Sequence, residues 1–392
     1  MRRVGHLPEP AAEVRLAYMD HAATSPPRPE AIEAMMPHLG RWFGNPSGSH
    51  SVARQAKAAL DSARDRIAEV LGVSPLRVVF TSGGTEADNL AVLGAARKGT
   101  GPVVCPASEH HAVLEPVRAS GGVTVAVDGN GVVDLAALEE AVRDGAALVS
   151  VMAVNNETGA LSPLREVADL VRRRAPGALL HTDAVQAAPT FDLAELAAGF
   201  DMVSVASHKL GGPKGVGVLV TGSEHLPLVL HGGAQEGGRR PGTQDVAGAV
   251  GMATALEASA RHRAAERSRV GRLRDVLSER IRASVPAAVE TCADVPRAPG
   301  HLHMRFPGME AEEILFLLDE KGVCASSGSA CASGASRPSH VLSAMGIPEA
   351  EVRSAVRFSL GWTTTADDVE QTAEAVAAAV GQLLAAGSRA CV

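Results

Sequence analysis

Residues Arg77–Leu90 read RVVFTSGGTEADNL, which joins an apolar run, a glycine turn and the start of a helix. The β-branched and aromatic residues of the apolar run are typical of a buried strand. Two glycines then allow a tight turn, and the residues that follow favour a helix. A strand that leads through such a turn into a helix is the βα unit from which parallel sheets are built.

The same alternation continues on both sides of this stretch. Between Ser51 and Leu71, small and apolar residues recur every three or four positions, which predicts a helix. The strands are predicted at Arg77–Thr81, Pro102–Cys105, Val123–Val127, Leu148–Val154, Ala178–Thr182, Asp201–Val205 and Val216–Val220. We therefore predict an α/β fold with a mostly parallel central sheet, helices on both faces, and ligand-binding groups at the C-terminal ends of the strands.

The alternation of predicted strands and helices stops after Gly242. Residues Asp245 to about Val285 are predicted to form one long helix rich in alanine and arginine. Prolines and a shorter mixture of α and β patterns follow, and the chain ends in a predicted amphipathic helix from Ala366 to Ala386. We place a domain change near residue 263. Residues 18–262 would form a large domain, and residues 263–392 a small α+β domain on which residues 1–17 pack.

Composition limits the classes of function. The 392 residues are 46% hydrophobic and 21% charged, as in an ordinary globular enzyme. A net charge of -7 gives no overall attraction to nucleic acid or acidic membranes, so we expect no direct nucleic-acid binding. One basic stretch stands out, because eight arginines lie between Arg261 and Arg282. A solvated helix face is the favoured explanation for it, and a docking face is the alternative.

The cysteines are odd in number and show no paired framework, which favours a reducing compartment; they are Cys105, Cys292, Cys324, Cys331 and Cys391. The first sixteen residues lack the apolar stretch of an export signal, and no apolar run approaches the length of a membrane span. These features predict a cytoplasmic protein.

The glycine turn of the opening stretch is a candidate phosphate site. Gly84 and Thr85 would present backbone N–H groups and a hydroxyl at a helix N-terminus, where the helix dipole favours an anion. The turn matches neither the dinucleotide fingerprint nor the Walker loop. An ordinary capped helix, with Thr85 as its N-cap, is the alternative.

Two further residues follow predicted strands. Asp183 should lie at a strand end, where a poorly solvated carboxylate needs a cationic partner such as a protonated pyridine nitrogen, although an N-cap role is equally compatible. Lys209 lies in a Gly/Pro-rich turn that could lower its pKa and make it nucleophilic toward an aldehyde. Lys214 is the competing lysine, but the predicted strand leads directly to Lys209. His110 is a candidate for stacking on a planar cofactor, ahead of His111.

Cys331 lies in Ser326–Gly334, SSGSACASG, a tract of small side chains that cannot form a packed core. We expect it to carry a thiol on a mobile segment. Cys324 and Cys331 could be considered as metal ligands, but no nearby histidine or cysteine spacing completes a ligand set, so no metal site is predicted.

Together these residues resemble a known family. The motifs that carry the resemblance are Asp183-x-x-Gln186, Ser207-His208-Lys209, Ser326–Cys331 and Val356–Gly361, VRFSLG. They resemble the cysteine desulfurases of the class V aminotransferases, in the long-loop subgroup of the NifS/IscS type. The similarity runs from Tyr18 through about Gly361. It implies the type I fold of transferases that depend on pyridoxal 5'-phosphate.

By this resemblance, Lys209 would hold pyridoxal 5'-phosphate as a Schiff base, and Asp183 would pair with the ring nitrogen. Gln186 would bond the ring hydroxyl, and His110 would stack on the ring and assist proton transfer. The phosphate contacts would be Gly84, Thr85, Ser207, His208 and, from a second subunit, Thr243. The family usually has serine where this chain has Ala206, so Ser207 would have to substitute for it.

The resemblance also implies the reaction. Asn156 and Arg357 would orient the substrate's α-carboxylate, and Cys331 would take the sulfur of L-cysteine as a persulfide, leaving L-alanine. The persulfide would pass to a sulfur-acceptor protein in iron–sulfur cluster assembly or thio-modification, and the enzyme would be a homodimer. Selenocysteine lyase and other class V activities are alternatives within the family. A scaffold without catalytic activity is the alternative outside it.

Overall fold

A computed structural model describes residues 15–99, 101–222, 226–328 and 338–390 of the chain. Its largest unit is a seven-stranded sheet. The strands, in spatial order, are β2 (Val78–Thr81), β8 (Gly217–Val220), β7 (Met202–Ala206), β6 (Leu179–Asp183), β5 (Leu148–Ser150), β3 (Val103–Pro106) and β4 (Val123–Val125). Only β8 runs antiparallel to its neighbours. The predicted α/β class with a mostly parallel sheet is therefore confirmed.

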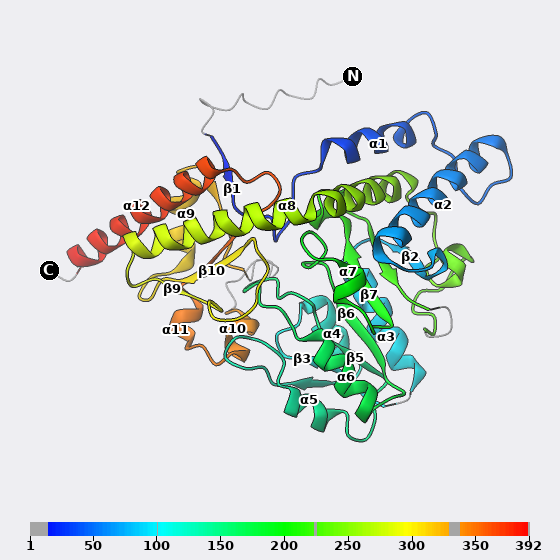
Figure 1. Cartoon of the computed structure of the whole chain (residues 1–392), viewed down its shortest axis with the longest axis horizontal. Coiled ribbons are helices and arrows are strands. Elements are labelled where there is room, and N and C mark those ends of the chain that lie inside the picture. Colours follow the sequence, from blue (N-terminus) through cyan, green and yellow to red (C-terminus); the bar gives the residue numbers. More distant parts are fainter. Residues whose placement is uncertain (1–14, 100, 223–225, 329–337, 391–392) are drawn as a thin grey trace.

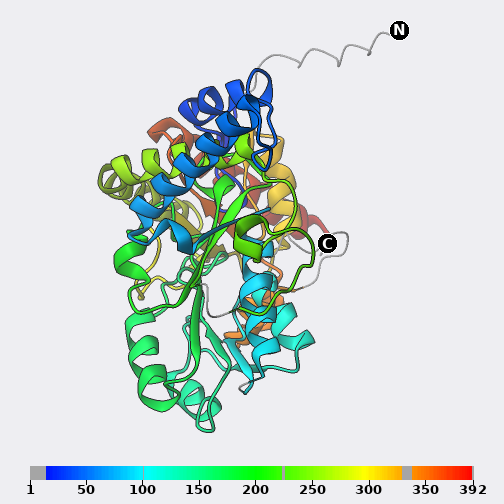
Figure 2. The ribbon, with the colours of Figure 1, turned by 90° about the vertical axis from the view of Figure 1, so that its right-hand side faces the viewer.

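Helices cover both faces of this sheet because successive strand residues alternate between two apolar cores (Figure 2). One core includes Val79 and Leu148 and is covered by α3 (Gly84–Lys98) and α4 (His111–Ala119). The helices over the other core are α2 (Ser51–Leu71), α5 (Leu135–Ala141), α6 (Leu164–Arg174), α7 (Leu193–Leu196) and the first part of α8 (Val246–Ser284). Another helix, α1 (Pro29–Leu39), packs on α8.

A second, smaller sheet has its own core. Strand β10 (His301–Arg305) lies between β12 (Ala355–Ser359) and β9 (Val289–Glu290), and both pairings are antiparallel. Two short parallel strands, β1 (Ala17–Tyr18) and β11 (Val323–Cys324), lie nearby. The helices around this sheet are α9 (Ala311–Asp319), α10 (His340–Ala344), α11 (Glu349–Val352) and α12 (Ala366–Ala390).

Helix α8 runs through both cores (Figure 1). It has 39 residues, and the Asp245 side chain caps its first turn by accepting a hydrogen bond from the Gly248 N–H at 2.9 Å. Met252 and Leu256 pack in the large core, whereas Leu277 and Ile281 pack in the small one. The domain boundary expected near residue 263 falls inside this helix and stays a prediction.

Candidate active site

The topology brings several predicted site residues to one edge of the large sheet. Because β8 alone is reversed, the chain leaves β2, β3, β5, β6 and β7 at the same edge. Gly84, His110, Asn156, Asp183 and Lys209 follow or end these five strands. This edge is where ligands bind in open α/β sheets.

Lys209 closes a 3₁₀ turn that directly follows β7. Its half-buried side chain donates hydrogen bonds from Nζ to the backbone oxygens of Ala22 (2.5 Å) and Ala23 (2.7 Å), in the segment after β1. Lys214, the competing lysine, is exposed to solvent. The amine of Lys209 therefore lies at the junction between the two sheets.

Asp183 ends β6 and is only 6% exposed. Its Oδ1 accepts a hydrogen bond from the Val185 N–H at 2.9 Å. Burial raises the pKa of Asp183 to about 6, although the Val185 hydrogen bond and the positive charge of Lys209 act in the opposite direction. A carboxyl group this buried, beside a cation, fits the protonated nitrogen of a pyridine ring.

Two more buried carboxyl groups lie behind Asp183. Burial and the charge of Asp183 raise the pKa of Asp88, on α3, well above its usual range. Burial also raises the pKa of Glu109, next to His110, and a hydrogen bond from the Met152 N–H only partly offsets this effect. Burial therefore favours the uncharged form of both groups, whereas the charge of Lys209 favours the ionised form of Asp183. The sequence signal for Asp88 was an acid on the apolar side of a predicted helix.

A buried histidine links Asp88 to the strands. The Nδ1 of His181 lies 2.8 Å from the Ser150 hydroxyl, and its Nε2 lies 2.9 Å from the Ser204 hydroxyl and 3.6 Å from Oδ1 of Asp88. Burial lowers the pKa of His181 to about 3, so the ring is neutral. This network crosses β5, β6 and β7 on the face covered by α3, and we did not predict it.

Two of the predicted histidines are also uncharged. His110 is the N-cap of α4, where its Nδ1 accepts a hydrogen bond from the Ala112 N–H at 3.1 Å. The Nδ1 of His208 lies 3.2 Å from the Thr24 hydroxyl. Burial, followed by the positive charge of Lys209, lowers the pKa of both histidines to about 4. Both rings are therefore neutral, and because Nδ1 of His110 accepts the Ala112 N–H, its Nε2 carries the proton and can donate a hydrogen bond.

The candidate phosphate turn is built as an open helix N-terminus. Helix α3 begins at Gly84, with Gly83 at a φ of 148° as its N-cap, so Thr85 lies within the first turn and is not the cap. A Cβ on Gly84 would lie 3.6 Å from the methyl group of Ala206. The hydroxyl of Ser207 is instead buried against Gly212, without a hydrogen-bond partner among the described residues. The phosphate contact of Ser207 stays a prediction.

The small sheet supplies the other side of the site. Arg357, on β12, is 3% exposed. It donates hydrogen bonds to the backbone oxygen of Asn156 and to Oδ1 of Asp20, both at 2.7 Å. Its Nε and the Oδ1 of Asn156 are buried without a partner in the described part of the chain. The Nε–H of Arg357 can donate to a ligand carboxylate, whereas the Oδ1 of Asn156, an acceptor, can pair only with a donor such as an amino group of the ligand.

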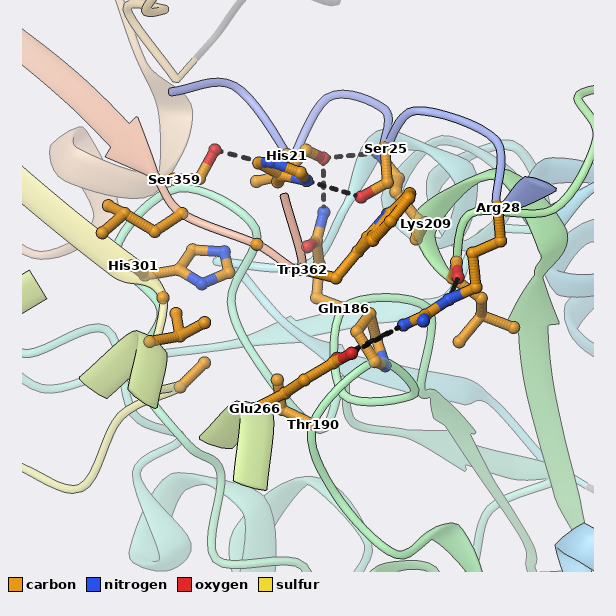
Figure 3. Close-up of a pocket in the computed structure, with 18 residues that line it drawn as sticks. His21, Ser25, Arg28, Gln186, Thr190, Lys209, Glu266, His301, Ser359 and Trp362 are labelled. Atoms are coloured by element: carbon orange, nitrogen blue, oxygen red, sulfur yellow. Dashed lines mark hydrogen bonds and ion pairs between the residues drawn. The ribbon is translucent and has the colours of Figure 1, made fainter. Parts of the chain in front are cut away.

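Residues of both sheets line a cavity of about 50 Å³ beside Lys209 (Figure 3). Gln186 lines it and donates a hydrogen bond from Nε2 to the Ala22 oxygen at 2.8 Å. His301 of β10 lies on the opposite wall. The charge of Lys209 lowers the pKa of both His110 and His301, so these rings lie within electrostatic reach of its amine.

One predicted site residue, Thr243, does not lie beside Lys209, and another, Cys331, is not described. Thr243 is exposed on the loop before α8 and does not line the cavity. Cys331 lies outside the described residues. The residues that flank its segment both approach Glu157, next to Asn156: the Ser339 hydroxyl donates to Glu157 Oε2 at 2.5 Å, and a Cβ on Gly328 would lie 3.5 Å from that side chain.

The described residues contain no cluster of three or more His, Cys, Asp or Glu side chains arranged to hold a metal ion. Across the same parts of the chain, none of the helices combines the length and the apolar character that crossing a bilayer requires.

Comparison with known proteins identifies the family. Residues 17–372 match the Aminotransferase class-V family. The chain is 42% identical to an IscS-like cysteine desulfurase of Mycobacterium tuberculosis, over 94% of this chain and 97% of the relative. It is 40% identical to a putative cysteine desulfurase, IscS 1, of Bacillus subtilis, over 93% and 99%. A solved NifS-like protein is 31% identical and superimposes with a TM-score of 0.87 over 94% of this chain and all of the other. The chain therefore belongs to the cysteine desulfurases of the class V aminotransferase family.

Proposed function

We propose that this cysteine desulfurase converts L-cysteine into L-alanine with Lys209 as its cofactor-binding base and Cys331 as its sulfur nucleophile. The observation that carries the proposal is that Lys209, in the turn after β7, lines one cavity with Ser359 of β12, the strand that also carries Arg357 with its unused Nε. The amine of Lys209 and the guanidinium group of Arg357, which come from the large and the small sheet regions, fit the two ends of a bound amino acid.

The enzyme depends on pyridoxal 5'-phosphate, as its family does. The residues present fit this group, because a buried carboxyl at Asp183 can pair with a protonated ring nitrogen and the open N-terminus of α3 at Gly84 can receive a phosphate. Gln186 would bond the ring hydroxyl, and Thr85 and His208 would add phosphate contacts. Once bound, the cofactor would withdraw electrons from the substrate's α-carbon.

The protein's own residues would supply binding and proton transfer. Arg357 and Asn156 bind the α-carboxylate, which fixes the α-carbon near Lys209. The amine of Lys209 removes the α-proton, and the neutral ring of His110 can carry a proton between positions. The Cys331 thiolate attacks the substrate sulfur. An S–S bond forms, the C–S bond breaks, and its electron pair stays with carbon, which is protonated to give alanine.

The sulfur would then pass to an acceptor protein, and α8 offers a docking surface for it. We call this surface the arginine groove; its basic residues are Arg261, Arg263, Arg267, Arg272, Arg274 and Arg297. Arg263 and Arg274 are neutralised by Asp192 and Asp275. Arg267 and Arg272 form no ion pair among the described residues, and Arg261 reaches only Glu257, at 4.0 Å. An acidic segment of the acceptor would complement these three charges.

The groove fits an acidic protein segment better than a nucleic-acid backbone. Its lining includes the carboxylates of Asp192, Glu195 and Asp275, which would repel a continuous row of phosphates. The chain as a whole carries a net charge of -7, which opposes a long polyanion. The groove also borders the catalytic cavity, because Thr190 lines both.

The proposed reaction is tested by comparing Cys331→Ser with Cys324→Ser. Wild-type protein and the Cys324→Ser control should form alanine from L-cysteine at similar rates. The Cys331→Ser variant should keep the visible absorption of bound cofactor but lose at least about 100-fold in alanine formation, because its nucleophile is gone. Alanine formation at the wild-type rate by Cys331→Ser would refute the proposal. Faster turnover of selenocysteine than of cysteine would favour the lyase alternative.

A further inference from the structure

His301 is the first residue of β10, and its side chain reaches the catalytic cavity. In the antiparallel register His301 lies opposite Ser359, and His303 lies opposite Arg357. Directly opposite residues share a face of a sheet, so His301 and Arg357 are diagonal neighbours on one face. Figure 3 shows the imidazole of His301 directed into the space between Ser359 and Trp362.

The backbone of the substrate loop makes room for this ring. Gly159, three residues after Asn156, has a φ of +79°, and a Cβ there would lie only 2.4 Å from Cβ of His301. Any side chain at position 159 would therefore collide with the histidine. The chain also ties the two segments together, since the Ala298 N–H donates to the Gly159 oxygen at 2.8 Å. His301 is thus held against the same loop that carries Asn156.

The ring is buried, neutral and incompletely bonded. His301 is 7% exposed, and its Nε2 is buried without a hydrogen-bond partner among the described residues. Burial lowers its pKa to about 3, and the positive charges of Arg357 and Lys209 act in the same direction. A neutral imidazole has one N–H to donate, and a buried polar atom without a partner is unfavourable until a ligand supplies one.

Two such atoms, Nε2 of His301 and Nε of Arg357, belong to residues that are diagonal neighbours on the paired strands β10 and β12. We propose that His301 is a further substrate-binding residue, which donates a hydrogen bond to the α-carboxylate of the amino acid beside Arg357. The proposal rests on the proposed function and extends its carboxylate site to β10. The charge pattern supports it, because the two cations with the largest effect on the pKa of His301, Arg357 and Lys209, are the ones expected at the two ends of the substrate.

The test compares His301→Leu, which removes the donor, with His301→Asn, which restores one. His301→Leu should raise KM for L-cysteine about tenfold, the usual effect of losing a hydrogen bond to a charged group, while kcat changes less than about threefold. His301→Asn should recover most of the loss. Turnover of cysteamine, which is cysteine without the carboxylate, should be the same in His301→Leu and wild-type protein.

A packing effect would give a different result. His303→Leu is the matched control, because His303 is also buried on β10 without partners for its ring nitrogens in the described chain, yet it does not line the cavity. An unchanged KM in folded His301→Leu, or an equal rise in His303→Leu, would overturn the proposal, as would an equal loss with cysteamine. Failure of wild-type protein to form alanine would instead refute the proposed function.

Discussion

At the scale of single residues, burial determines which groups around Lys209 carry charge. Burial raises the pKa of Asp88 and Glu109 well above the usual range, and it lowers the pKa of His110 to about 4 and of His301 to about 3. Asp183 is the carboxyl group left to balance a cation, because the charge of Lys209 partly offsets its burial. The site therefore presents few competing charges to a bound amino acid and cofactor.

The buried acid Asp88 gives a test of this view. The pKa of Asp88 is higher in the folded protein than in the unfolded chain, where it is about 4. The contribution of Asp88 to the free energy of unfolding is therefore complete below pH 4 and is lost as the pH rises toward the raised pKa. Asp88→Asn should therefore stabilise the cofactor-free protein at pH 8 relative to pH 4.5, by about 1.4 kcal/mol for each unit of the raised pKa. Urea unfolding at the two pH values measures this.

Asp65→Asn is the control for that experiment, since Asp65 is exposed on α2 and should give no such difference. If Asp88→Asn destabilises the protein equally at both pH values, the carboxyl group is ionised in the fold and the view is wrong.

Local sequence was enough to select some site residues but not others. Lys209, Asp183 and His110 could be selected as candidates because each ends or follows a recognisable strand, and the structure brings these three residues to one edge of the sheet. His301 has no local signal for a ligand, and an acid on the apolar side of a predicted helix, as at Asp88, does not indicate which residues it contacts. Their environment depends on Arg357 and His181, which are far away in the chain, and one sequence does not contain that pairing.

At the scale of elements, long periodic segments were predicted best. The helix expected from Ser51 to Leu71 has those bounds, and the long helix expected from Asp245 to about Val285 is α8. All seven predicted strands extend one or more residues beyond the observed bounds at one end, because short apolar runs do not mark where pairing begins or ends. The two-residue strands β1 and β11 were missed, since a pair so short has no period and forms only through long-range contact.

The arginine groove on α8 can be tested by charge reversal. Arg267→Glu with Arg272→Glu should slow sulfur transfer from the persulfide to an acidic acceptor protein about tenfold, because electrostatic attraction speeds encounter. Alanine formation with dithiothreitol as acceptor should be unchanged. The measurement is transfer of ³⁵S from labelled cysteine.

Helix α6 offers a matched control for this test. Arg165 and Arg173 are exposed there without an ion pair among the described residues, so their reversal should leave transfer unchanged. An equal loss in both double variants would indicate a general effect of net charge, and unchanged transfer in the α8 variant would exclude the groove as the docking surface.

At the scale of the whole molecule, the exposed position of Thr243 suggests a site shared between two subunits. If Thr243 contacts the cofactor bound by the partner subunit, the Lys209→Ala homodimer and the Thr243→Ala homodimer should each be less active than the wild-type protein. A mixed dimer would contain one intact site, built from Lys209 of one subunit and Thr243 of the other. Co-expressed with different affinity tags, the purified hybrid should regain up to about half of the wild-type activity per dimer. A hybrid no more active than its parents would place Thr243 in its own subunit's site or in none.

The whole molecule should also be sensitive to mild acid. Burial lowers the pKa of six histidines to about 3 or 4; they are His21, His110, His181, His208, His301 and His303. The contribution of these histidines to the free energy of unfolding is complete above pH 6.5, the approximate pKa of histidine in the unfolded chain. It is lost as the pH falls from there toward the folded pKa values of 3 to 4. Four buried carboxyl groups whose pKa is raised oppose this, but they are four groups against six; they are Asp88, Glu109, Glu157 and Asp183.

We therefore expect the urea midpoint of the cofactor-free protein to fall between pH 7.5 and pH 5, with each histidine contributing up to about 1.4 kcal/mol per pH unit. The variant His303→Gln should show a weaker pH dependence. A midpoint that stays constant or rises on acidification would contradict the expectation.

The length of α8 has a mechanical consequence. At 1.5 Å per residue, its 39 residues span about 58 Å, and the two ends of the helix pack in different cores. The helix contacts the turn that carries Lys209 and also strand β10, which pairs with the strand of Arg357. A bend in the middle of α8 would therefore change the distance between Lys209 and Arg357, so the stiffness of this helix helps to keep the two sides of the site at a fixed separation.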